Sequence, residues 1–245
     1  MTGRLDPVGS HHGSEDASNF DEYATSYDDA LGRGLAATGE DRSYFARGRI
    51  EWLRRCLDRI QFAAGSTVEF GCGTGSNVPF LIELAGATSV VGIDTSERSL
   101  EVARSTFGSS KAQFCGLSEY DARGSADLVF CNGVFHHIPP PDRAAAVEYI
   151  YRCLKPGGLF ALWENNPWNP GTRYIMSRVA FDHDAITLNP RQSRRLVTAA
   201  GFEVLRTDYL FIFPRFLRWL RTLEPPLSSI PIGGQYELLC RKPLD

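Results

Sequence analysis

The sequence lacks the features that mark several large classes of protein. Its six cysteines form no C-x-x-C pair and its five histidines form no cluster with them, so the spacing predicts neither a zinc site nor a disulfide framework. No apolar run approaches the length that crosses a bilayer. The first 18 residues are polar and lack the apolar stretch of a signal peptide. We therefore expect a cytoplasmic protein with reduced thiols and no bound metal.

The chain also lacks an excess of charge of either sign. Lysine and arginine number 26 against 29 aspartates and glutamates, a net charge of −3, which gives no indication of a nucleic-acid partner. With 245 residues and 43% hydrophobic content, the chain can bury one sizeable core. We predict a disordered tail over residues 1–18 and a single domain over residues 19–245.

Short apolar runs alternate with amphipathic helical stretches through most of the chain. The runs that read as strands are, in order, STVEF, SVVGID, AQFCGL, DLVFCNGVF and LFALWEN. Continuous rather than alternating apolar residues are typical of parallel strands buried on both faces. Two later runs, EVLRTDYLFIF and QYELLCRKP, suit an antiparallel pair that closes the sheet. The pattern predicts an α/β fold with seven mostly parallel strands, helices on both faces and an insertion before the last strand.

A glycine-rich turn follows the first predicted strand. Gly71, Gly73 and Gly75 give G-x-G-x-G rather than the G-x-G-x-x-G of dinucleotide-binding proteins, and no G-K-[ST] of a P-loop follows. Glu69 lies two positions before the turn, where a carboxylate repels pyrophosphate but attracts an ammonium group. Asp94 ends the second predicted strand and can accept hydrogen bonds from both hydroxyls of a ribose. These residues indicate a ligand with an ammonium group and a ribose but no phosphate.

In these segments the sequence resembles the class I S-adenosylmethionine-dependent methyltransferases. The segments that carry the resemblance are VEFGCGTGSN, VVGIDTS, AQFCGL, DLVFCNGVFHHIPP and LKPGGLFALWE, in the order of the family. The resemblance implies a Rossmann-like fold with S-adenosylmethionine as the cofactor. It also implies a helical cover over residues 19–62, a cofactor-binding core over 63–165 and a substrate-facing part over 166–245.

The resemblance further implies roles for individual residues around the cofactor. Glu69 would lie near the methionine ammonium, and either Arg47 or Arg49 would pair with the methionine carboxylate. Many members place an aspartate on the adenine amine after the third strand, where this chain has Leu117, so backbone groups or Glu119 would substitute. The predicted cofactor contacts are Tyr27, Arg47, Glu69, Gly71, Cys72, Gly73, Gly75, Asp94, Thr95, Leu117, Ser118, Asn132 and Gly133.

Two histidines just past the fourth predicted strand are candidates for the general base. His136 and His137 lie where the resemblance places the transferred methyl group, and histidine titrates near neutral pH. Adjacent side chains point in different directions, so we expect at most one to be catalytic, with His137 preferred. The predicted substrate contacts are Tyr23 and, after the fifth predicted strand, Glu164, Asn165, Asn166 and Trp168, with Arg173, Asp182, His183 and Asp184 as further candidates.

The sequence therefore predicts methyl transfer to a small-molecule or lipid-like acceptor, at oxygen in preference to nitrogen or carbon. NGVF in place of an NPPY-like motif argues against the exocyclic amines of nucleobases. A non-catalytic cofactor-binding protein and a nicotinamide oxidoreductase are the alternatives, and Ser76, where the dinucleotide motif has glycine, opposes the second. Residues 210–234 mix aromatics with arginines and admit three interpretations: a lid, a helix at a membrane surface, or an extension packed on its own domain or a dimer partner. We expect a monomer or a homodimer.

Overall fold

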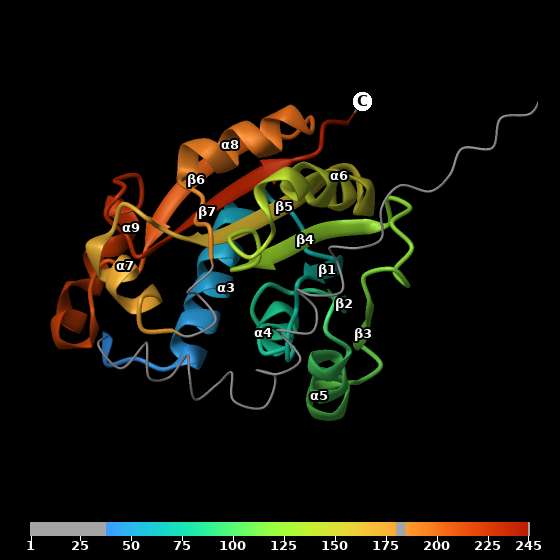
Figure 1. The fold of residues 1–245 in the computed structure, drawn as a ribbon, viewed down its shortest axis with the longest axis horizontal. Coiled ribbons are helices and arrows are strands. Elements are labelled where there is room, and N and C mark those ends of the chain that lie inside the picture. Colours follow the sequence, from blue (N-terminus) through green and yellow to red (C-terminus); the bar gives the residue numbers. More distant parts are fainter. Residues whose placement is uncertain (1–37, 180–184, 245) are drawn as a thin grey trace, which may run out of the picture.

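The computed structural model describes residues 38–179 and 185–244, which form one seven-stranded sheet flanked by helices (Figure 1). The strands lie in the order β3-β2-β1-β4-β5-β7-β6. The first five strands pair with one another in parallel, whereas β7 runs antiparallel to both β5 and β6. The strands are β1 (Ser66–Phe70), β2 (Ser89–Asp94), β3 (Ala112–Gly116), β4 (Ala126–Asn132), β5 (Leu154–Asn165), β6 (Glu203–Leu210) and β7 (Gln235–Arg241). The predicted sheet, mostly parallel with an antiparallel pair at one edge, is confirmed.

Helices cover both faces of this sheet. Residues of α3, α4 and α5 pack in a hydrophobic cluster on one face, and residues of α6 and α8 pack in a second cluster on the other. Among the described residues, no helix is both long enough and apolar enough to cross a membrane. The α-helices are α3 (Arg42–Arg59), α4 (Val78–Glu83), α5 (Glu97–Phe107), α6 (Arg143–Cys153), α7 (Pro170–Met176), α8 (Pro190–Ala199) and α9 (Glu224–Leu227), and the 3₁₀ helices are η2 (Pro140–Asp142) and η4 (Arg215–Leu223).

Strand β5 shows why the central strands contain runs of consecutive apolar residues. Leu159, Ala161 and Trp163 belong to one hydrophobic cluster, and Phe160 and Leu162 belong to the other. Successive side chains of a strand point to opposite faces of the sheet, so a strand covered by helices on both sides alternates between two cores. All five side chains are fully buried. Burial of each of the larger ones contributes about 1.5–3 kcal/mol to stability.

Capping residues fix where the helices begin beside the sheet. Asp41 and Ser96 each accept a hydrogen bond from a backbone N–H in the first turn of α3 and α5, an arrangement that typically stabilises a helix by about 1 kcal/mol. The start of α3 also reaches the glycine-rich turn, because Arg42 Nη2 lies 3.5 Å from Thr74 Oγ1. The predicted helical cover falls partly on residues 19–37, which lie outside the described residues.

The segment between β6 and β7 is the predicted insertion before the last strand, and it contains η4 and α9. Glu224 is buried and accepts hydrogen bonds from the backbone N–H groups of Phe211, Ile212 and Phe213. Phe211 adopts a φ of 60°, a conformation that non-glycine residues rarely adopt. The three hydrogen bonds to Glu224 therefore hold Phe211 in this strained conformation and offset part of its energetic cost.

Candidate active site

The glycine-rich turn after β1 leaves open space at the carboxyl end of the sheet. The backbone N–H groups of Gly71 and Cys72 donate to the Ile93 carbonyl, 2.8 and 3.1 Å away, which ties the turn to β2. Gly73 has a φ of 51°, and a Cβ built on it would meet nothing within 4 Å. A Cβ on Gly71, in contrast, would lie 2.4 Å from Val134 Cγ2. The turn is therefore closed by packing at Gly71 and open to a ligand at Gly73.

Glu69 supplies a buried acid next to this open turn. It is 1% exposed, and Oε1 accepts a hydrogen bond from Asn77 Nδ2 at 2.7 Å. Oε2 is buried and has no hydrogen-bond partner among the residues that the structure describes. Burial raises the pKa of Glu69 to about 8, although Asn77, Arg49 and Arg42 act to lower it. An unpaired buried carboxyl oxygen is costly, and an ammonium group is the partner that would satisfy it.

Asp94 joins the turn to the start of α5. Its Oδ2 accepts a hydrogen bond from the Gly73 N–H at 2.7 Å, and its Oδ1 accepts one from the Ser96 N–H at 2.9 Å. A carboxylate has two lone pairs on each oxygen, so Asp94 is a group that can bind backbone N–H groups and ribose hydroxyls together. These donor-site features fit the amino-acid and ribose parts of S-adenosylmethionine: an orphaned buried acid, an open glycine and an anchored aspartate.

The remaining predicted cofactor residues lie around the same strand ends. Asn132 ends β4, Gly133 follows it, and both line a cavity. Asn132 Oδ1 is buried and finds no hydrogen-bond partner in the described part of the chain. Leu117 donates its N–H to the Asp94 carbonyl, and Glu119 accepts a bond from the Gly116 N–H. Ser118 and Thr95 are exposed, Cys72 is buried, and Gly75 closes the turn with a φ of 79°. Tyr27 lies outside the described residues.

The two candidate histidines both line this cavity, and one of them is anchored. His136 Nδ1 lies 2.6 Å from Glu164 Oε2, and the two side chains are 3% and 1% exposed. Burial acts to raise the pKa of Glu164, but the charge and hydrogen bond of His136 together with the Phe135 N–H outweigh it, so the pKa lies below its usual range. Glu164 is therefore an ionised group that orients the imidazole. The ring of His137 lies 4.1 Å from that of His136, centroid to centroid.

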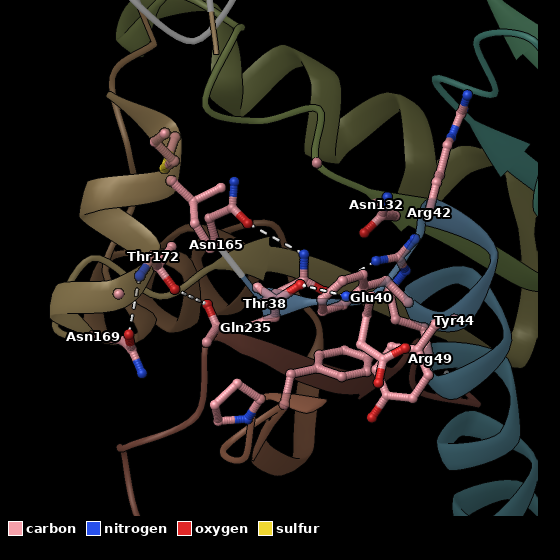
Figure 2. A pocket seen from close by; sticks show the side chains of 18 of the residues that line it. Thr38, Glu40, Arg42, Tyr44, Arg49, Asn132, Asn165, Asn169, Thr172 and Gln235 are labelled. Carbon is pink, nitrogen blue, oxygen red and sulfur yellow. Dashed lines mark hydrogen bonds between the residues drawn. The ribbon is translucent and has the colours of Figure 1, made fainter. Parts of the chain in front are cut away.

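The cavity has a volume of about 350 Å³ and runs from the donor site to the insertion (Figure 2). Its donor end includes Ser76, Asn77 and Asn132. At the other end an aromatic and aliphatic wall is formed by Phe45, Phe211, Phe213, Ile175 and Met176. Among the described residues that line it, the charged ones are three arginines, Arg42, Arg49 and Arg221, and one glutamate, Glu40. These described residues carry two more positive than negative charges.

A polar strip crosses the cavity between sheet and helix. Arg49 Nη1 donates to Gln235 Oε1 at 3.1 Å, and Gln235 Nε2 donates to Asn165 Oδ1 at 3.2 Å. Figure 2 shows Asn165 and Gln235 directed toward each other. Arg221 forms an ion pair with Glu40 at 2.9 Å and lies over the ring of Tyr44. These groups come from α3, β5, β7 and η4 and from the segment just before α3. Because they lie far apart in the sequence, no local motif predicts that they meet.

The structure does not bring every predicted substrate residue to the cavity. Asn165 lines it, whereas Glu164 lies behind His136. Asn166 is fully buried, and its Nδ2 donates a hydrogen bond to the Gly233 carbonyl at 2.8 Å. Trp168 is 44% exposed, outside the lining, with Arg191 over its ring.

The arginines of α3 divide between solvent and cavity. Arg47 pairs with Glu51 on the exposed face, whereas Arg49 is buried and lines the cavity. Arg173 is exposed and does not line it either. Tyr23, Asp182, His183 and Asp184 lie outside the described residues.

Comparison with known proteins agrees with this geometry. The family described as "Methyltransferase domain" matches residues 68–160, from β1 into β5. A trans-aconitate 2-methyltransferase from Azoarcus sp. is 31% identical over 51% of this chain, but the match spans only about half of that protein (50%). One from Rhizobium etli is 30% identical over 69% of this chain and 66% of its own length. A methyltransferase structure from Thermotoga maritima superposes with a TM-score of 0.62 at 20% identity, over 93% of this chain and 99% of that one. The chain belongs to the class I S-adenosylmethionine-dependent methyltransferases.

Proposed function

We propose that this methyltransferase acts on an oxygen of a small organic acid, with a carboxylate as the group that is methylated. The observation that carries the proposal is the excess of arginine over glutamate among the described residues that line the cavity beside the donor site. Two of the similar proteins are named trans-aconitate 2-methyltransferase, which supports an acid as the acceptor.

A charge count supports an anionic acceptor when the donor is bound. The methionine part of S-adenosylmethionine has one ammonium and one carboxylate group, which Glu69 and one arginine would match. Arg49 and Arg42 are the arginines whose charges act on Glu69, so they lie at the donor end. Arg221 also lines the cavity, where it pairs with Glu40 and lies over the ring of Tyr44. The positive charge that remains favours an acceptor with one or more carboxylates.

The residues of the chain would act mainly by positioning. Bound S-adenosylmethionine supplies an electrophilic methyl group on sulfur. Alignment of an acceptor oxygen with this methyl group accounts for most of the catalysis that such a displacement needs. The wall around Phe211 and Phe213 would exclude water, and His136, held by Glu164, would direct its second ring nitrogen to the acceptor. A carboxylate acceptor is already ionised at neutral pH, so no base is required.

A hydroxyl group is the second candidate acceptor, because the His136–Glu164 pair also has the geometry of a general base and its orienting carboxylate. The two candidates differ in the product, an ester or an ether.

The test is a screen of acids, phenols and amines with isotopically labelled S-adenosylmethionine. The expected product is a methyl ester, whose label is lost on mild alkaline hydrolysis, whereas a methyl ether or amine keeps it. Arg221→Gln should raise the KM for the acid about tenfold or more and leave donor affinity unchanged. Arg218→Gln, on the exposed side of the same helix, is the matched control. A label that resists alkali on every accepted substrate rules out the ester.

A further inference from the structure

Exposed apolar side chains gather on two segments that also line the cavity. In residues 211–234, Phe216 is 76% exposed and Trp219 is 71% exposed, with Leu223, Ile230 and Ile232 each more than 40% exposed. In residues 165–179, Trp168 and Tyr174 are 44% and 53% exposed. Large exposed apolar side chains are normal when they are scattered singly, but a group of them on one face marks an interaction site.

The two segments lie against each other, so these side chains share one end of the molecule. Asn169 Nδ2 donates to the Ile232 carbonyl at 2.7 Å, and Thr172 Oγ1 donates to the Gly234 carbonyl at 2.7 Å. In Figure 1, α7 and α9 lie together at the end of the molecule opposite the C-terminus. We call the exposed side chains of residues 165–179 and 211–234 the apolar face.

The charges on the same two segments are almost all positive. The segments contain five arginines, Arg173, Arg178, Arg215, Arg218 and Arg221, and a single acidic residue, Glu224. Glu224 is buried and accepts three backbone hydrogen bonds, so it adds no charge to the surface. Four of the arginines are exposed, and the fifth, Arg221, is partly buried and paired with Glu40. The apolar face therefore combines protruding aromatic rings with exposed guanidinium groups and no exposed carboxylate of its own.

We propose that the apolar face docks on the surface of a membrane that contains anionic phospholipids. Tryptophan and other aromatic side chains favour the boundary between headgroups and acyl chains, and arginines near an anionic leaflet are attracted to it. Phe216 and Trp219 are both more than 70% exposed in the 3₁₀ helix η4. Aromatic rings this exposed, beside exposed arginines, suit insertion between anionic lipid headgroups.

Docking through the apolar face would place the cavity at the side of the molecule that faces the membrane. Tyr174 belongs to one of the two segments, and Phe213, Pro214 and Arg221 belong to the other, and all four line the cavity. The proposal does not depend on which acceptor the cavity takes, because it rests only on exposed side chains and on charge.

The test is cosedimentation of the full chain with two kinds of vesicle, phosphatidylcholine alone and phosphatidylcholine mixed with phosphatidylglycerol. We expect binding to the anionic vesicles that weakens with added salt. Trp219→Ser and Arg218→Glu should each reduce the bound fraction at least about fivefold. Leu244→Ser and Arg195→Glu are matched controls, because both side chains are exposed and lie outside the apolar face, and they should bind like the unmodified chain.

Three results would overturn the proposal. They are no cosedimentation with anionic vesicles, equal binding to neutral vesicles, and binding that survives in both variants. A dimer in size-exclusion chromatography that Trp219→Ser abolishes, without vesicle binding, would assign the face to a second copy instead. Thermal melts check that the variants fold, and Phe216→Ser, which removes the most exposed ring of the face, provides a second apolar variant.

Discussion

Asn77 Nδ2 donates a hydrogen bond to Glu69 Oε1 at 2.7 Å, and Asn77 itself lines the donor end of the cavity. Burial raises the pKa of Glu69 to about 8, so the carboxyl carries a proton at pH 7 in the free protein. An ammonium group bound beside it favours the ionised form. Binding of the donor should therefore release this proton.

We predict that S-adenosylmethionine releases close to one proton at pH 7 when it binds. Calorimetry in two buffers with different ionisation enthalpies measures the number, and the release should disappear at a pH well above 8, where Glu69 is already ionised. Glu69→Gln keeps a hydrogen-bonding group for Asn77 but should bind about tenfold or more weakly without proton release. Equal heats in both buffers for the unmodified protein would refute the assigned role of Glu69.

The second prediction for the donor site is that substitution of Asp94 weakens cofactor binding. Its two oxygens already accept bonds from the N–H groups of Gly73 and Ser96, so Asp94→Asn should weaken both the turn and the ribose contacts. We expect about tenfold weaker binding of S-adenosylhomocysteine. An analogue that lacks both ribose hydroxyls isolates the direct contact, because its affinity should fall much less on substitution. If both ligands lose affinity equally, Asp94 acts only through the turn.

The fold and the donor end of the site were predictable because their signals are local. Strands buried on both faces give continuous apolar runs, as β5 does, and Glu69 and Asp94 stand at fixed places relative to strand ends. The predicted strands are confirmed by the structure. Each of these signals lies within a few residues of the feature that it predicts.

The acceptor end of the cavity has no local signal. Arg49 meets Gln235 across 186 positions of sequence, and Phe211 reaches the cavity through a backbone conformation that its residue type does not favour. The polar residues at 164–169 stand out in the sequence as ligand candidates, but the side chain of Asn166 instead donates hydrogen bonds to backbone carbonyls. Turn chemistry and ligand contacts use the same residue types, so only the fold separates them.

The His136–Glu164 pair predicts opposite pH dependences for the two candidate acceptors. An imidazolium beside the Glu164 carboxylate can donate to an anionic acceptor, so kcat/KM for an acid should fall as pH rises above neutral. A hydroxyl acceptor needs the neutral imidazole as base, so its kcat/KM should rise over the same range. Initial rates from pH 6 to 9 on the accepted substrate decide between them.

Substitutions at the pair test whether Glu164 acts through His136. Glu164→Gln removes the charge that stabilises an imidazolium, so it should lower kcat/KM for an acid about tenfold to a hundredfold and move the fall in the profile to lower pH. His136→Asn should abolish the pH dependence, and His137→Asn should keep it. If Glu164→Gln keeps the wild-type dependence of kcat/KM on pH, this glutamate has only a structural role.

The last prediction concerns a buried carboxyl far from the donor site. Glu237 of β7 is fully buried and lies opposite Asp208 of β6 in the antiparallel pair. Asp208 is held by Arg206 and by Trp52 Nε1, 3.1 Å away. Burial, and next the charge of Asp208, raise the pKa of Glu237 to about 8 from 4.5.

Stability should therefore decrease as pH rises between these two values. In that window the folded chain keeps a proton on Glu237 that the unfolded chain has lost, so the free energy of unfolding falls with pH, and above pH 8 this contribution is constant. Glu237→Gln retains the shape of the side chain without the titration. Urea unfolding across the window should show a shallower slope for the variant, which should be more stable than the unmodified protein at pH 8 by roughly 4 kcal/mol. A variant that keeps the full slope and gains no stability would show that Glu237 does not titrate in this window.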